Sequence, residues 1–206
     1  WRDPPVHRFP AAGVLDLRAA WVVEDPGWII AREGCLLPDH SWFIGAVDAI
    51  PGWPVKPRDP HRLSGVSLTL ASHFASVNYG HFLLDTLGRL DLFRRAGFAP
   101  EAVDHWILPR PPSPSAQELL EQLKIPDSRR IVLADHPEGL WAERLLAPTF
   151  PGTRRNYPPW LPPFLRRQFL PPTLPPPTRR LFISREGHPR NLANRAALWP
   201  HLLDRG

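Results

Sequence analysis

Four polar or small residues stand at helical spacing inside the apolar segment 78–90. On a helix, His81, Asp85 and Gly88 follow Asn78 by three, seven and ten positions, so the four residues share one face. A polar stripe in so apolar a segment must meet water, a cleft or hydrogen-bonding partners, because burying an unpaired polar group is costly. A carboxylate beside an imidazole can accept a proton from a hydroxyl group, which is general-base chemistry.

The same spacing also allows a purely structural interpretation. His81 and Asp85 stand four residues apart and could form an ion pair that only stabilises the helix. Gly88 would let another group approach the helix backbone closely. The spacing alone leaves the catalytic and the structural interpretation open.

A second segment, residues 179–194, combines arginines with a predicted strand and a predicted helix start. Residues 181–184 are strand-like, Arg185 and Arg190 follow in a loop, and Asn194 is suited to cap a helix. In open α/β sheets, ligands bind beyond the carboxyl ends of the strands. Arginine binds phosphate through paired hydrogen bonds, and a helix N-terminus adds N–H donors. Arg185 and Arg190 are therefore candidate diphosphate ligands, the alternative being two ordinary solvated arginines.

The elements that must position these residues follow an α/β order. Short antiparallel strands are predicted first, at 21–23, 27–30 and 34–37. Beyond them the pattern alternates strands and helices, with strands at 66–70, 105–109, 130–133 and 143–150 and helices at 79–96 and 115–123. Ser115 and Glu118 have the spacing of a capping box at the start of the second helix. This alternation predicts a parallel sheet with crossover helices.

Proline separates this region from the last part of the chain. Residues 158–177 are crowded with proline, which predicts a stiff connector, with a polyproline ligand as the alternative. A strand at 181–184 and a helix at 194–204 follow. The predicted division is a first lobe at 1–157, a linker at 158–178 and the start of a second lobe at 179–206.

Composition narrows the class of protein. Of the 206 residues 43% are hydrophobic, which is typical of a globular core, and no stretch is apolar for long enough to cross a bilayer. The net charge of +5 comes mostly from arginines that are scattered in pairs, whereas a nucleic-acid binder would concentrate them in one stripe. Cys35 is the only cysteine, which excludes an internal disulfide and predicts a small buried residue in a reducing compartment. Because no methionine occurs, the chain is expected to be part of a longer protein.

Several motifs are absent from the sequence. There is no Gly-x-Gly-x-x-Gly fingerprint, no phosphate loop of the Walker type and no Gly-x-Ser-x-Gly nucleophile elbow. No Asp-x-Asp pair occurs, and the histidines lack metal-ligand spacing. No metal and no cofactor are therefore expected.

At its two informative segments the sequence resembles glycosyltransferase family 61, whose bacterial members are linked to capsular and other surface polysaccharides. The family block Asn-Tyr-x-His-[Trp/Phe]-Leu-x-Asp-x-Leu-Pro-Arg-Leu corresponds to residues 78–90, with Gly88 in place of proline. A later block, a strand ending in Ile-Ser-Arg and then Arg and Asn opening a helix, corresponds to residues 181–185, Arg190 and Asn194. Arg195 stands where the family commonly has an acidic residue, and the family's downstream His-Gly-Ala-Gly-type loop does not occur in these residues.

The resemblance implies a GT-B-like architecture, in which a Rossmann-like N-terminal lobe with a small N-terminal β region faces a second Rossmann-like lobe that is truncated here after its start. It also implies an inverting, metal-independent transfer of a sugar from a nucleotide-sugar to a glycan or lipid-linked glycan. The residues it assigns are Asp85 and His81 for catalysis, with Asp85 as the base, Arg185, Arg190, Asn194 and Ser184 for donor binding, and Asn78, Tyr79 and Arg89 for the acceptor side of the cleft.

Truncation or decay of the transferase leaves a second class of function open. These residues alone are expected to be inactive, and the alternative to an enzyme is a non-catalytic lobe that binds a glycan or a nucleotide. A nucleic-acid partner is not expected. The expected location is the cytoplasm, with peripheral association at the inner face of the cell membrane left open.

Overall fold

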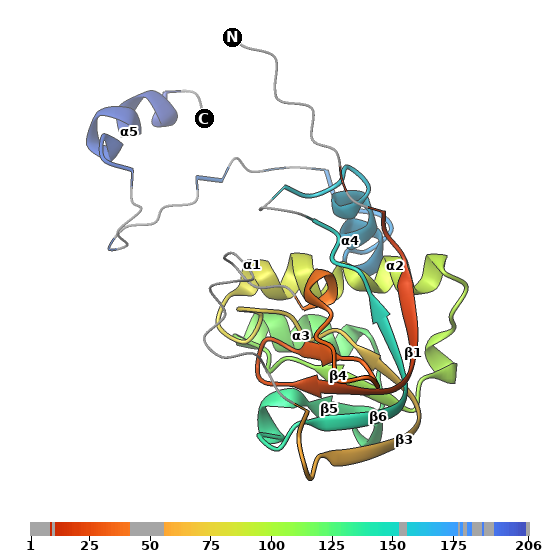
Figure 1. Ribbon diagram of the computed structural model, residues 1–206. Helices are drawn as coiled ribbons and strands as arrows, with labels where there is room; N and C mark the ends of the chain where they lie inside the picture. The colour runs from red at the N-terminus through yellow and green to blue at the C-terminus, as the bar shows by residue number, and fades with distance from the viewer. Residues whose placement is uncertain are drawn as a thin grey trace. The chain divides into compact units, whose positions relative to one another are not determined.

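The computed structural model describes residues 9, 11–41, 56–152, 156–176, 178, 181–182, 187 and 192–204. The chain divides into two compact units, Trp1–Leu170 and Pro171–Gly206, and each is described by itself. The first unit is built on a six-stranded sheet (Figure 1). Its strands are β1 (Val14–Val23), β2 (Trp28–Ile30), β3 (His61–Thr69), β4 (His105–Leu108), β5 (Arg130–Val132) and β6 (Leu140–Pro148).

The sheet is mixed, with the order β2-β1-β6-β3-β4-β5. Strands β6, β3, β4 and β5 are parallel to one another, which confirms the predicted parallel sheet. Strands β1 and β2 form a hairpin that joins the same sheet, because β1 pairs antiparallel with β6. The hairpin turn requires Gly27, whose φ is +74° and whose added Cβ would lie 2.5 Å from the Cβ of Ala71. The turn is therefore packed directly against the segment that follows β3.

The α-helices and the π-helical segment described in the first unit cover one face of the sheet. They are α1 (Tyr79–His81), the π-helical segment η3 (Phe82–Leu87), α2 (Arg89–Arg95), α3 (Pro114–Gln122) and α4 (Leu161–Phe169). Figure 1 shows α1 and α2 as one continuous rod along the sheet. Leu68, Trp106 and Leu146 point from the strands into the core beneath these helices. Their sequence neighbours Ile107 and Leu145 point to the opposite face, as the alternation of side chains along a strand requires.

Short 3₁₀ helices connect several of these elements. They are η1 (Pro38–His40), η4 (Pro100–Ala102), η5 (Asp127–Arg129) and η6 (Leu133–Asp135). In the second unit the described residues form one helix, α5 (Arg195–Leu203). A strand was predicted at 181–184, but Leu181 and Phe182 adopt no regular structure and residues 183–184 lie outside the described residues.

Four local predictions need correction. The strand predicted at 34–37 is not formed, and Leu36 makes only an isolated bridge with Ile30. Helix α3 is capped by Ser113, whose Oγ accepts a hydrogen bond from the backbone N–H of Ala116 at 3.2 Å. The helix starts two residues earlier than predicted, because Pro114 is well suited to the first helical position. Cys35 is exposed rather than buried. Strand β6 begins at Leu140, three residues before the predicted strand.

The proline-rich region also differs from a simple connector. Leu161 and Phe164 of α4 are buried in the core of the first unit, so this helix belongs to that unit and the division falls after Leu170.

None of the helices among the described residues combines the length and the apolar character needed to cross a membrane.

Candidate functional site

The candidate site lies where the strand order of the sheet reverses. The chain proceeds from β3 to β4 and then to β5, whereas β6 lies on the other side of β3. Strands β3 and β6 are parallel neighbours, so their carboxyl ends, Thr69 and Pro148, point to the same edge. Ligands of open α/β sheets bind at such a point, beyond the carboxyl ends of the strands. The chain that leaves β3 here enters the α1–η3–α2 helix.

Asn78 starts this helix. Its backbone is extended, with φ −138°, and its side-chain Oδ1 accepts hydrogen bonds from the N–H groups of Gly80 at 2.9 Å and His81 at 3.2 Å. The side chain of Asn78, which was expected on the acceptor side of a cleft, therefore caps the first turn of the helix. That turn fixes the backbone position of His81.

His81 and Asp85 form the centre of the site. The Nδ1 atom of His81 lies 2.7 Å from Oδ2 of Asp85, and the hydroxyl of Tyr157 donates to Oδ1 of the same carboxylate at 2.9 Å. The His81 side chain is 17% exposed and that of Asp85 only 4%. The imidazole thus lies toward the surface and the carboxylate behind it.

The electrostatics of Asp85 reflect this position. Burial raises the pKa of the Asp85 carboxyl, while hydrogen bonds from His81 and Tyr157 and the nearby charges of His81 and Arg89 oppose the rise. A carboxylate held on both oxygens and bonded to Nδ1 orients the imidazole, so any proton that His81 accepts arrives at Nε2.

The helix is distorted where it carries Asp85. Residues 82–87 form π-helical turns. Such turns are rare in proteins, and those that occur are often found at functional sites. On the inner side of these turns the hydroxyls of Ser72 and Thr86 lie 2.9 Å apart in the buried interior. Gly88 follows, and a Cβ there would lie 2.7 Å from Cδ1 of Leu161. The close approach that Gly88 was expected to permit is therefore made by α4.

Arg89 is fully buried and does not line a cleft, contrary to the prediction. Its Nε and Nη2 donate to the carbonyl oxygen of Pro148 at 2.9 and 2.7 Å, and Nη1 donates to that of Ala71 at 2.8 Å. Complete burial lowers its pKa to about 9, with the charge of Asp85 acting in the opposite direction, so the guanidinium is still charged at neutral pH. Arg89 fastens the helix to the ends of β3 and β6 and so sets where Asp85 stands.

The loop after β3 places aromatic side chains beside His81. Phe74 stacks on His73 with ring centroids 3.8 Å apart, and its ring lies 5.8 Å from that of His81. Its φ is +64°, a region that bulky residues seldom adopt and that costs conformational energy. Phe74 is 37% exposed and Tyr79 is 41% exposed.

Burial lowers the pKa of His73, and the charge of His81 adds to this effect while that of Asp25 opposes it.

The predicted donor-binding residues belong to the second unit. Ser184, Arg185 and Arg190 lie outside the described residues. Asn194 precedes α5, but its side chain makes no capping hydrogen bond. The assignment of these residues to donor binding stays a prediction.

Possible metal ligands gather elsewhere in the part of the chain that the structure describes. One group of three ligand side chains, His61, His136 and Glu138, is found there, at the start of β3. It is far in sequence from the His81–Asp85 pair, and no ligand spacing in the sequence indicated it.

Comparison with known proteins gives one match. A family model described as Glycosyltransferase 61 matches residues 79–206, which include the first turn of α1 and the whole described part of the second unit. No curated protein and no solved structure matches the chain significantly.

Proposed function

The chain belongs to glycosyltransferase family 61, and we propose that it serves the transfer of a sugar from a nucleotide-sugar to a hydroxyl group of a glycan or glycolipid during synthesis of a surface polysaccharide. The observation that carries this proposal is the His81–Asp85–Tyr157 arrangement at the reversal of the strand order. The family match begins two residues before His81.

In this proposal His81 is the general base and Asp85 orients it. The acceptor hydroxyl gives its proton to Nε2 of His81 while its oxygen attacks the anomeric carbon of the donor. The bond from that carbon to the diphosphate breaks, and the nucleoside diphosphate leaves from the opposite face, which inverts the configuration. The buried carboxylate of Asp85 stabilises the imidazolium that forms.

Geometry favours this division of roles over direct catalysis by Asp85. Both oxygens of the carboxylate already accept hydrogen bonds, and its side chain is 4% exposed. The imidazole is the more exposed member of the pair. A substrate hydroxyl can therefore approach the ring more readily than the carboxylate behind it.

We further propose that exposed aromatic rings near His81 bind the acceptor. Phe74 in the loop before the helix and Tyr79 at its first position both expose part of an aromatic ring. The C–H face of a sugar ring packs well against such a surface, while its hydroxyls stay in water. The strained backbone of Phe74 fits this role, because strain is retained where a side chain must be held in one position.

The donor is assigned to the second unit by the resemblance of its sequence. Arg185 would bind the diphosphate through paired hydrogen bonds, supported by Arg190, Ser184 and Asn194. Positive charge at this place stabilises the leaving group, so the proposed transfer needs no metal ion. Cytoplasmic synthesis, with the acceptor at the inner face of the membrane, fits a soluble donor and a lipid-linked acceptor.

The natural full-length protein provides the test. Incubation with a panel of nucleotide-sugars and acceptor glycans is expected to release free nucleoside diphosphate with one of the donors. Calorimetry of the Arg185→Ala variant with that donor is expected to show weaker binding than the unsubstituted protein. Binding of a nucleotide-sugar without release of nucleoside diphosphate, across the whole panel, would instead identify a non-catalytic binding lobe.

A further inference from the structure

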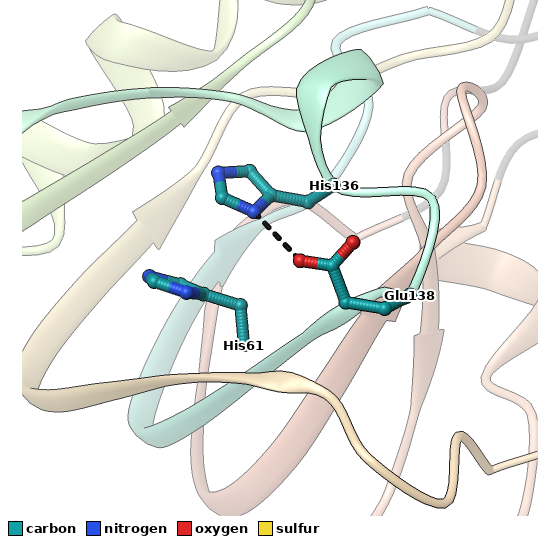
Figure 2. A group of neighbouring side chains, drawn as sticks. All are labelled: His61, His136 and Glu138. Atoms are coloured by element: carbon teal, nitrogen blue, oxygen red, sulfur yellow. Dashed lines mark hydrogen bonds and ion pairs between the residues drawn. The ribbon is translucent and has the colours of Figure 1, made fainter.

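Three ligand side chains converge at the amino end of β3, the opposite end of that strand from the His81–Asp85 pair. His61 is the first residue of β3, while His136 and Glu138 belong to the turn that leads into β6 (Figure 2). One donor atom of each lies within 4.8 Å of those of the other two. The His136 ring and the Glu138 carboxylate already point toward each other, with Nδ1 and Oε1 3.0 Å apart.

The backbone holds the three residues in this arrangement. The N–H of His61 donates to the carbonyl oxygen of Gly139 at 3.0 Å, and the N–H of Gly139 donates to that of His136 at 2.9 Å. Gly139 has a φ of +77°, and a Cβ there would lie 2.9 Å from Cγ of Pro57. The turn is therefore closed by hydrogen bonds and by tight packing, and its side chains are presented on a fixed frame.

The geometry is close to what a metal ion needs. In a tetrahedral zinc site with ligand bonds of about 2.0–2.2 Å, neighbouring donor atoms stand roughly 3.3–3.5 Å apart. The His136–Glu138 pair is already near this separation, and the rings of His61 and His136 lie with their centroids 4.6 Å apart and their planes tilted by 36°. His61 and Glu138 are exposed, so rotation of their side chains would bring the donors to bonding distance.

The ligand types select the class of ion. Two imidazole nitrogens and one carboxylate oxygen suit zinc, cobalt, nickel and copper, whereas magnesium and calcium prefer oxygen ligands alone. Three protein ligands leave a fourth position for water.

We propose that His61, His136 and Glu138 bind a divalent transition-metal ion of the zinc type, and that the ion fastens the start of β3 to the turn before β6. The site is independent of the proposed transfer, because none of its residues takes part in the His81–Asp85–Tyr157 arrangement. Its chemical effect is structural, a cross-link between two neighbouring parallel strands.

Calorimetric titration of the 206-residue chain with ZnCl₂ tests the proposal, with MgCl₂ as the comparison ion. The expected result is saturable binding of one zinc ion per chain and no comparable binding of magnesium. The variants His61→Asn and Glu138→Gln should each bind zinc at least tenfold more weakly. His201→Asn, which removes an exposed histidine outside the group, should bind like the unsubstituted chain.

Thermal unfolding gives a second readout that does not depend on heats of binding. Zinc should raise the Tm of the unsubstituted chain and of His201→Asn, but not that of His61→Asn or Glu138→Gln, because a ligand that binds only the folded state stabilises it. Circular dichroism before each titration establishes that the variants are folded, which is expected since both substituted side chains are exposed. Equal zinc affinity in all four proteins, or no saturable binding at millimolar zinc, would overturn the assignment.

Discussion

Tyr157 donates its hydroxyl hydrogen to Oδ1 of Asp85 at 2.9 Å and so joins the segment after β6 to the helix after β3. The other oxygen of the same carboxylate is bonded to His81. A residue from outside the helix therefore completes the arrangement on which the proposed base depends. The chain has only two tyrosines, and the second, Tyr79, supplies a matched control.

Tyr157→Phe removes one hydrogen bond from a buried carboxylate and keeps the aromatic ring. We expect the free energy of unfolding to fall by about 1.5–3 kcal/mol, the usual range for a hydrogen bond to a charged group. Urea denaturation at neutral pH measures the change. Tyr79→Phe, at an exposed position, should stay within ~0.5 kcal/mol of the unsubstituted chain. Equal stabilities of the two variants would show that the Tyr157 bond contributes nothing.

The raised pKa of Asp85 predicts a pH dependence of stability. Because burial lifts the folded-state pKa above its ordinary value of 3.8, ionisation of this carboxyl costs more in the folded than in the unfolded chain. Its contribution to stability is fully present below pH 3.8 and is lost as the pH rises through the folded-state pKa.

The Asp85→Asn variant isolates this contribution, since asparagine does not titrate. The difference in unfolding free energy, unsubstituted chain minus variant, should decrease as the pH rises from below 3.8 and then become constant. Urea denaturation across this range provides the values. An increase of the difference with pH would mean that the hydrogen bonds outweigh burial and that the folded-state pKa is lowered.

Much of the scaffold could be predicted from the sequence, and the reasons differ between elements. The helix expected at 79–96 is found at 79–95, because its apolar residues recur at helical spacing and Asn78 is a strong N-cap. The parallel strands after it follow from their apolar runs. The π-helical turns at 82–87 have no such signal in the local sequence.

The contacts around the candidate site were harder to predict from the sequence. Tyr157 lies in a proline-rich segment with no spacing that links it to Asp85, so only the tertiary fold reveals their contact. Arg89 was assigned to the acceptor side of the cleft, yet three hydrogen bonds to carbonyl oxygens allow it to be buried. The group of His61, His136 and Glu138 was missed because metal-ligand spacing describes sites built from adjacent residues.

Arg89→Lys tests the buried clamp between the helix and the two strands. Lysine keeps the charge but lacks the planar fork, so at least one of the carbonyl oxygens of Ala71 and Pro148 loses its donor. We expect a loss of about 2–4 kcal/mol in unfolding free energy. Arg95→Lys, on the same helix and 60% exposed, should change stability by less than ~0.5 kcal/mol. Similar losses for both variants would contradict a special role for Arg89.

Phe74→Ala tests the proposed acceptor surface beside His81. Loss of about 1 kcal/mol of ring contact should raise KM for the acceptor glycan roughly fivefold and leave kcat nearly unchanged. Steady-state kinetics of the full-length protein gives both constants. Val77→Ala changes a more exposed apolar residue in the same loop and should leave KM unaltered. A fall in kcat without a change in KM would place Phe74 outside the acceptor site.

The central claim is that the His81 imidazole accepts the proton of the acceptor hydroxyl and that Asp85 orients it. Measurement of kcat/KM for His81→Gln in the full-length protein, beside Asp85→Asn and the double variant, addresses it most directly. The account predicts a loss of at least about 10²-fold for His81→Gln, with little further loss in the double variant, because the two residues act as one unit. Turnover of His81→Gln within threefold of the unsubstituted enzyme would contradict it.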